Sequence, residues 1–140
     1  MNNDTAAEWL CQKALTQFFN GLDDRRFEAM LANLAPEGIW LRQGVELKGR
    51  AGVAAVLAER SATVVTRHLL SNTVIQVTGE SAVGETVAII YHHDDKTGKL
   101  PAKLEAPRAI LGFKANFRRF PEGWLIERLA SSRLFAAESH

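Results

Sequence analysis

A histidine and an amide project together from the stretch between residues 66 and 79, which reads TRHLLSNTVIQVTG. The second half of this stretch alternates apolar and polar residues with the two-residue period of a half-buried strand. Successive side chains of a strand point to opposite faces, so we expect one face to carry His68, Leu70, Asn72 and Val74. Imidazole titrates near neutral pH and suits acid or base chemistry, and an amide hydrogen-bonds a carbonyl or hydroxyl group. We therefore interpret this face as the floor of a pocket. The alternatives are a core histidine bonded to the backbone and an asparagine at a β-bulge.

Further aromatic and cationic residues occupy positions from which they can line such a pocket. Trp40 lies on a short hairpin, where a large aromatic side chain most often forms core or pocket wall. Tyr91 shares its strand parity with His93, and it aims its phenol either inward or toward the surface. Arg60, Arg67 and Arg108 are cations for an anionic ligand, and the parity of Arg108 points it into the cavity.

The run His92-His93-Asp94-Asp95 invites comparison with a metal site. Adjacent residues of a strand point to opposite faces, so the two histidines do not reach one ion together, and no spaced third ligand follows. We expect neither a metal nor a cofactor.

Length and charge restrict the classes of protein further. A chain of 140 residues with 46% hydrophobic and 24% charged residues suits one globular domain over residues 1–140. A net charge of +1 argues against nucleic acid as the main partner. No stretch is apolar for long enough to cross a membrane, and the N-terminal residues lack the order of a secretory signal. The single cysteine, Cys11, cannot form an internal disulfide, which indicates the reducing cytoplasm. We expect it to be a small buried side chain.

The apolar pattern predicts helices first and long strands afterwards. One helix starts at Asp4 or Thr5 and ends at Gly21, and Asp23 or Asp24 opens a second helix that stops near Pro36. A hairpin that turns at Gln43-Gly44 and a third helix follow. We expect the third helix at residues 51–62 and, after it, four strands at 64–78, 81–91, 104–120 and 124–135.

Consecutive strands joined by short turns pair antiparallel, and helices that precede them pack on one face of the sheet. The sequence therefore predicts an α+β domain in which three N-terminal helices cover a strongly curved, mainly antiparallel sheet. We place Phe113, Phe117 and Leu129 on its outer face, where an apolar set indicates a homodimer formed through the sheet.

Several motifs occur in the order of a known family. They are LDDRRF at 22–27, the hairpin with Trp40, LKGR at 47–50, Glu59-Arg60 at the end of the third helix, and TRHLLSN at 66–72. Together they cover nearly the whole chain, which resembles the SnoaL-like branch of the nuclear transport factor 2-like superfamily. The resemblance implies a cone-shaped α+β barrel with a deep cavity. Members of this superfamily include polyketide cyclases, scytalone dehydratase, ketosteroid isomerase, ring-hydroxylating dioxygenase β subunits and binding proteins.

The resemblance also implies roles for two residues. Asp23 matches an acidic residue at the start of the second helix of dehydratase-like members, and His68 matches the histidine of their Thr-x-His segment. A second dehydratase histidine is replaced here by Thr86, and two further polar positions fall on Leu111 and Phe113. The tyrosine and acid pair of ketosteroid isomerase is not recognisable.

We therefore expect a small cytoplasmic enzyme that moves a proton on a hydrophobic or aromatic ligand. His68 abstracts or delivers the proton, Asp23 orients the imidazole, and Asn72 with Tyr91 holds a developing oxyanion. Dehydration, isomerisation and cyclisation all fit this chemistry. The alternatives are a binding module without turnover and a structural subunit that resembles a dioxygenase β subunit.

Overall fold

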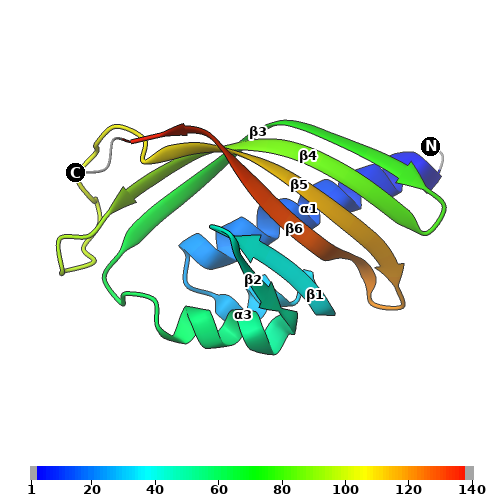
Figure 1. Ribbon diagram of the computed structural model, residues 1–140, viewed down its shortest axis with the longest axis horizontal. Coiled ribbons are helices and arrows are strands. Elements are labelled where there is room, and N and C mark those ends of the chain that lie inside the picture. The colour runs from blue at the N-terminus through cyan, green and yellow to red at the C-terminus, as the bar shows by residue number, and fades with distance from the viewer. Residues whose placement is uncertain (1–2, 138–140) are drawn as a thin grey trace.

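Six strands form one curved sheet that arches over a long helix (Figure 1). The computed structural model describes residues 3–137. Its elements are α1 (Asn3–Asp23), α2 (Phe27–Leu31), β1 (Leu34–Arg42), β2 (Val45–Lys48), α3 (Gly49–Ala58), β3 (Val65–Thr78), β4 (Ser81–His93), β5 (Ala109–Phe120) and β6 (Gly123–Ala136). The predicted α+β class and order of elements are confirmed.

The strand order is β2-β1-β6-β5-β4-β3, and every neighbouring pair is antiparallel except β1 with β6. The β1–β2 hairpin turns at Gln43 and Gly44, whose φ angles of 52° and 78° lie in the left-handed region. Two such residues in succession form the tight turn that matches the twist of a hairpin. The turn predicted at these two residues is confirmed.

Helix α1 packs on the concave face of the sheet, and α3 packs beside β1. Phe18 and Phe19 are fully buried, and the ring of Phe18 meets Trp40 edge to face at 5.2 Å.

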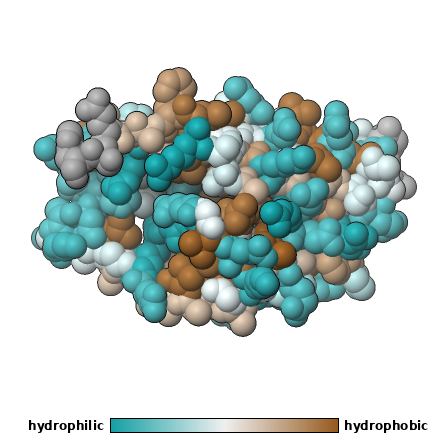
Figure 2. All heavy atoms as spheres, in the orientation of Figure 1, coloured by the Kyte–Doolittle hydropathy of each residue, from teal (hydrophilic) through white to brown (hydrophobic). Residues whose placement is uncertain are grey.

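On the surface, hydrophobic residues appear near the centre of the face shown in Figure 2, among hydrophilic ones. Among residues 3–137, no helix is both long and apolar enough to cross a bilayer.

The inward face of β5 and β6 is the opposite of the one predicted. Phe113, Phe117 and Leu129 have exposed fractions of 5%, 0% and 0%, and they lie in the core. The prediction that they form an outer apolar face is wrong. Alternation along a strand shows which residues share a face, but only the position of α1 decides which face is buried.

A bulge in β3 reverses the alternation after Ser71. The register with β4 shifts between Ser71 and Val74, and Asn72 adopts a left-handed φ of 56°. Thr73 then bonds Thr86 on the buried side at 2.7 Å, while Val74 is 61% exposed. The prediction that Asn72 and Val74 share the face of His68 is wrong, because the extra residue turns the strand over.

Several predicted ends also differ from those observed. Helix α1 continues past Gly21 to Asp23, and α2 begins only at Phe27, without a side-chain cap at its N-terminus. Arg25 breaks the helical path with a φ of 58°. Helix α3 ends at Ala58, and the strand predicted from residue 104 begins at Ala109 after a long loop.

Candidate functional site

Asp23 is the last residue of α1 and His68 lies near the start of β3, and the fold brings the two residues together. Asp23 Oδ1 lies 2.7 Å from His68 Nδ1, and Asp23 Oδ2 accepts the backbone N–H of His68 at 2.7 Å. The Asp23 side chain is 0% exposed and that of His68 is 11% exposed. The two residues matched by the family resemblance therefore form a buried acid–imidazole pair, although 45 positions separate them.

Asp23 accepts a third hydrogen bond, from the hydroxyl of Thr66 to Oδ1 at 2.8 Å. Burial by itself raises the pKa of this carboxyl, but the hydrogen bonds and charge of His68, together with Thr66, outweigh it. The pKa of Asp23 is therefore lowered from its ordinary value of 3.8. An ionised carboxylate only accepts hydrogen bonds, so the Nδ1 of His68 carries the proton that Asp23 receives. In the neutral imidazole, Nε2 is then the unprotonated nitrogen that can act as a base.

The imidazole is also held from one side by an aromatic ring. Phe19 stacks on His68 with ring centroids 4.9 Å apart and an angle of 27° between the planes, and Phe19 in turn contacts Phe113. The hydrogen bond at Nδ1 and the stacked ring fix the orientation of the imidazole, while the second hydrogen bond holds the backbone of His68. Among residues 3–137, no side chain or backbone group hydrogen-bonds His68 Nε2, so this nitrogen is unpaired within the described chain.

The hydrogen-bond chain continues from Thr66 to a group of arginines. Arg60 Nη2 donates to Thr66 Oγ1 at 2.8 Å, while Arg60 Nε is buried without a partner. The pKa of Arg60 is lowered by burial and by the positive charges of Arg42 and Arg25, against an opposing effect of Asp23. The Arg42 guanidinium lies 5.1 Å from the centre of the Trp40 ring. Positive charge therefore accumulates around Arg60, on the side of the Asp23–His68 pair where Thr66 lies.

The other predicted site residues lie in different places. Trp40 is buried beside Phe18, and Leu70 packs against the core, so both line the interior. Tyr91 is opposite Arg67 in the β3–β4 pairing, on the face of the sheet away from His68. Arg108 is exposed and approaches His92 Nδ1 at 3.3 Å, and it precedes β5. The structure thus brings Asp23, His68, Trp40 and Leu70 to the concave side, but not Asn72 or Tyr91. Arg108 instead approaches His92, which lies opposite Thr66 in the β3–β4 pairing.

Thr66 and Arg42 are site residues that the sequence interpretation missed. Thr66 shares strand parity with His68, and Arg42 shares it with Trp40, so alternation alone places each beside a residue already singled out. Their role becomes visible only when the hydrogen bonds that join Thr66 to both Asp23 and Arg60 are known.

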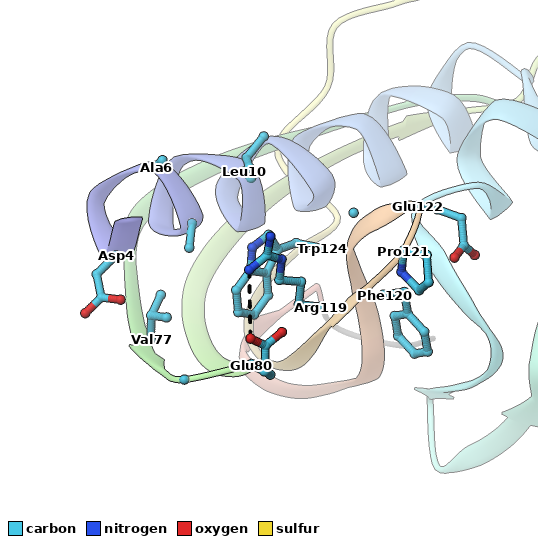
Figure 3. Close-up of a pocket in the computed structure, with 13 residues that line it drawn as sticks. Asp4, Ala6, Leu10, Val77, Glu80, Arg119, Phe120, Pro121, Glu122 and Trp124 are labelled. Atoms are coloured by element: carbon cyan, nitrogen blue, oxygen red, sulfur yellow. Dashed lines mark ion pairs between the residues drawn. The ribbon is translucent and has the colours of Figure 1, made fainter. Parts of the chain in front are cut away.

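Two clefts lie elsewhere on the surface. The larger, of about 650 Å³, lies between the N-terminal half of α1 and the β3–β4 and β5–β6 turns (Figure 3). Leu10, Trp124 and an ion pair of Arg119 with Glu80 at 3.8 Å line it. The smaller, of about 110 Å³, lies against the loop that follows β4 and includes Thr66 and Tyr91. Neither cleft is lined by Asp23 or His68. Among residues 3–137, no group of three or more His, Cys, Asp or Glu side chains is arranged to hold a metal ion.

Comparison with known proteins agrees with this architecture. A family model described as SnoaL-like domain matches residues 4–130. A Nostoc punctiforme protein of unknown function with a cystatin-like fold superposes with a TM-score of 0.74 at 17% identity, over 89% of each chain. A ketosteroid isomerase-like protein of Erwinia carotovora atroseptica superposes with a TM-score of 0.72 at 17% identity, over 96% of this chain and 98% of that chain. An NTF2-like protein of Novosphingobium aromaticivorans gives 0.71 at 19% identity, over 87% and 78%. No curated protein matches the sequence.

Proposed function

The chain belongs to the SnoaL-like domain family, and from this premise we propose that it is a cofactor-independent enzyme that moves a proton on a hydrophobic or aromatic ligand. The observation that carries the proposal is the two-point contact between Asp23 and His68. A buried carboxylate that accepts a hydrogen bond from Nδ1–H fixes the tautomer of the imidazole and presents Nε2 as a base. The fold alone does not select this function, because one fold hosts many activities.

In the proposed reaction, His68 Nε2 removes a proton from a carbon next to a carbonyl group of the ligand. The imidazolium that results is stabilised by the negative charge of Asp23 at 2.7 Å. The same proton then returns to another atom in an isomerisation, or to a leaving hydroxyl in a dehydration. A general base of this kind contributes roughly two to four powers of ten to the rate. The proposed class is therefore a lyase or an isomerase, and cyclisation fits the same step.

Solvent exchange tests this proposal with model ketones in place of the natural substrate. Aromatic and steroid-like ketones and β-hydroxy ketones are incubated with the protein in D2O, and proton NMR follows loss of the C–H signal or of water. We expect exchange with wild type and a loss of about a hundredfold or more in His68→Gln. His93→Gln is the matched control, because His93 is partly exposed and pairs with Glu105 at 3.4 Å, outside the site. Equal rates in wild type and His68→Gln would overturn the proposal.

One observation favours a second candidate, a ligand-binding module without turnover. The His68 side chain is only 11% exposed, and the two clefts described above do not reach it. A buried Asp–His pair can also serve to fasten α1 to β3. The exchange experiment separates the two functions, because a binding module raises its melting temperature with a ligand but exchanges no proton.

We also propose that the protein is a cytoplasmic homodimer, formed through the outer face of the sheet. The pairing register aligns Leu69, Ile89, Ile110 and Phe135 in one row across β3, β4, β5 and β6. Leu69 and Phe135 are 49% and 69% exposed, so this row leaves apolar surface uncovered in one copy. It takes the place of the core residues predicted for this role. The unpaired Cys11 is compatible with the reducing cytoplasm.

A further inference from the structure

Three arginines lie around Arg60, itself one of them, which Thr66 joins to the Asp23–His68 pair. None of the three forms an ion pair with a carboxylate among residues 3–137. They are Arg25, Arg42 and Arg60, which come from the α1–α2 connection, the end of β1 and the segment after α3. The charges of Arg42 and Arg25 both act on Arg60. By contrast, Arg67 and Arg118 on the surface each pair with a carboxylate, at 3.1 Å and 2.8 Å. Arg60 therefore lies among other cations and has no carboxylate paired with it.

Arg60 is the most constrained of the three. Its Nη2 donates to Thr66, but its Nε is buried and has no acceptor. A buried donor without a partner costs free energy, and a buried cation costs more. Asp23 does not relieve this cost, because neither of its oxygens accepts a hydrogen bond from Arg60 Nε. An acceptor from outside the chain would satisfy Arg60 Nε.

Arg42 provides a second cation on the same inner side. It shares its strand parity with the buried Trp40, and its guanidinium lies 5.1 Å from the centre of that ring. A guanidinium that lies over a ring keeps its edge N–H groups available. Arg25 is committed elsewhere, since its Nη1 donates to the carbonyl of Ser61 at 2.8 Å. Arg42 and Arg60 therefore remain as the pair of donors for a ligand.

We infer that the site takes ligands that carry a carboxylate, which Arg42 and Arg60 hold beside the imidazole of His68. This inference rests on the proposed function for the location of the ligand, and it adds the chemical class of the substrate. Planar guanidinium donors match the planar geometry of a carboxylate. The buried rings of Phe19 and Trp40 make the surroundings of these donors apolar, which suits a carboxylic acid with an aromatic body. The substrate class is thus an aromatic or polycyclic carboxylic acid.

Binding of 2-naphthoate and of its neutral isostere 2-naphthamide tests the inference. Calorimetry measures both affinities in wild type, Arg42→Gln, Arg60→Gln and Arg60→Lys. We expect the amide to bind about ten- to a hundredfold more weakly than the acid, and each Gln variant to lose a similar factor for the acid only. Arg118→Gln is the matched control, because Arg118 is exposed and paired with Glu127, and we expect wild-type affinity from it.

A second readout covers the case in which Arg60→Gln fails to fold. Nitrogen-15 NMR of the arginine side chains in wild type follows the Nε–H signal of Arg60 during titration with 2-naphthoate and, separately, with inorganic phosphate. We expect the carboxylate to shift this signal, and phosphate to do so less. Equal binding of acid and amide, no shift of Arg60 Nε–H at millimolar naphthoate, or a response to phosphate alone would each overturn the inference.

The outcome is distinguishable from failure of the proposed function. His68→Gln should still bind 2-naphthoate, because the arginines are intact, and should lose only proton exchange. Suppose that naphthoate binding depends on Arg42 and Arg60 but the protein exchanges no proton on any ketone. That result would uphold the carboxylate inference and overturn the proposed enzymatic function. Exchange on neutral ketones that is not inhibited by 2-naphthoate would do the reverse.

Discussion

Asp23 holds His68 at two points, since its Oδ2 receives the backbone N–H and its Oδ1 faces the ring Nδ1, both at 2.7 Å. The carboxylate ends α1, where the helix dipole disfavours a negative charge. The interactions with His68 and Thr66 outweigh this effect, so the pKa of Asp23 is nevertheless lowered. The same contact therefore fastens the helix to the sheet and prepares the imidazole as a base.

Asp23→Asn should destabilise the protein in a manner that depends on pH. The pKa of Asp23 is lowered in the folded state from 3.8, so the unfolded chain binds its proton first as pH falls. The stability contributed by the ionised carboxylate is thus fully present well above pH 3.8, and it is lost progressively as pH falls below 3.8 through the lowered pKa of the folded state. We expect a cost of about 3 kcal/mol at pH 7, measured by urea unfolding, and a smaller difference from wild type near pH 3.

Asp24→Asn is the matched control for that experiment. Asp24 is partly exposed and pairs with Arg26 and Arg67 on the surface. Exposed pairs contribute little, so its substitution should cost about 0.5 kcal/mol or less. A difference between Asp23→Asn and wild type that stays constant from pH 7 to pH 3 would contradict the assignment of an ionised, tightly bonded Asp23.

Thr66→Val and Thr66→Ser together isolate the hydroxyl that joins Arg60 to Asp23. Valine keeps the shape but leaves Arg60 Nη2 without its acceptor and removes one of the two hydrogen bonds to Asp23 Oδ1. We expect Thr66→Val to cost about 2 kcal/mol of unfolding free energy, because unsatisfied buried groups are expensive. Thr66→Ser keeps both bonds and should cost about half as much, chiefly for the lost methyl group. Thermal unfolding measures both variants, and a serine variant less stable than the valine one would contradict this role.

Local patterns in the sequence were sufficient for the order of elements and for part of the site. Apolar residues recur every two positions in a half-buried strand and about every 3.6 positions in a helix, and this difference separates the two kinds of element. Gln43-Gly44 alone indicates a tight hairpin turn. The pairing of Asp23 with His68 was proposed from the family resemblance, and the distance of 2.7 Å agrees with it.

The errors have a common physical cause, which is that tertiary packing decides what a strand pattern leaves open. Nothing local to Phe113 and Phe117 indicates that α1 covers their face. Asn72 adopts a left-handed conformation, and the resulting bulge reverses every later side chain of β3. Alternation places Thr66 beside His68 and Arg42 beside Trp40, but it does not show that distant segments meet there and join Thr66 to both Asp23 and Arg60.

Cys11 should be inert to thiol reagents in the folded protein. It is 0% exposed, and burial raises its pKa to about 12, so neither access nor thiolate is available at pH 8. We expect Ellman's reagent to react only as fast as the protein opens, and at once in concentrated urea. Gln12→Cys in a Cys11→Ala background is the control, because residue 12 is exposed on the same helix and should react immediately. Rapid labelling of native Cys11 would show that α1 is not packed as described.

Leu69→Glu and Phe135→Glu should each convert the proposed dimer into a monomer. Both residues belong to the apolar row on the outer face of the sheet, and a dimer would bury the introduced charges. Light scattering after size exclusion measures the mass. Leu104→Glu is the control, since Leu104 is 83% exposed in the loop before β5, and it should leave the mass unchanged. A wild-type protein that is monomeric at high micromolar concentration would contradict the dimer.

Gly21→Ala and Gly52→Ala should change stability in opposite directions, although both replace a helical glycine. A Cβ at Gly21 would lie 2.7 Å from Met30 Cβ and 2.8 Å from its Cα, too close for the backbone of α2 to stay in place. We expect a loss of about 2 kcal/mol from this overpacking, with a weaker hold on Asp23 two residues later. A Cβ at Gly52 meets only the carbonyl carbon of Leu47 at 3.8 Å, an ordinary contact. Alanine there should therefore stabilise α3 by about 0.5 to 1 kcal/mol, because it reduces the entropy lost on folding. Urea unfolding of both variants checks the pair, and a Gly21→Ala protein as stable as wild type would show that α1 and α2 approach less closely than the structure has them.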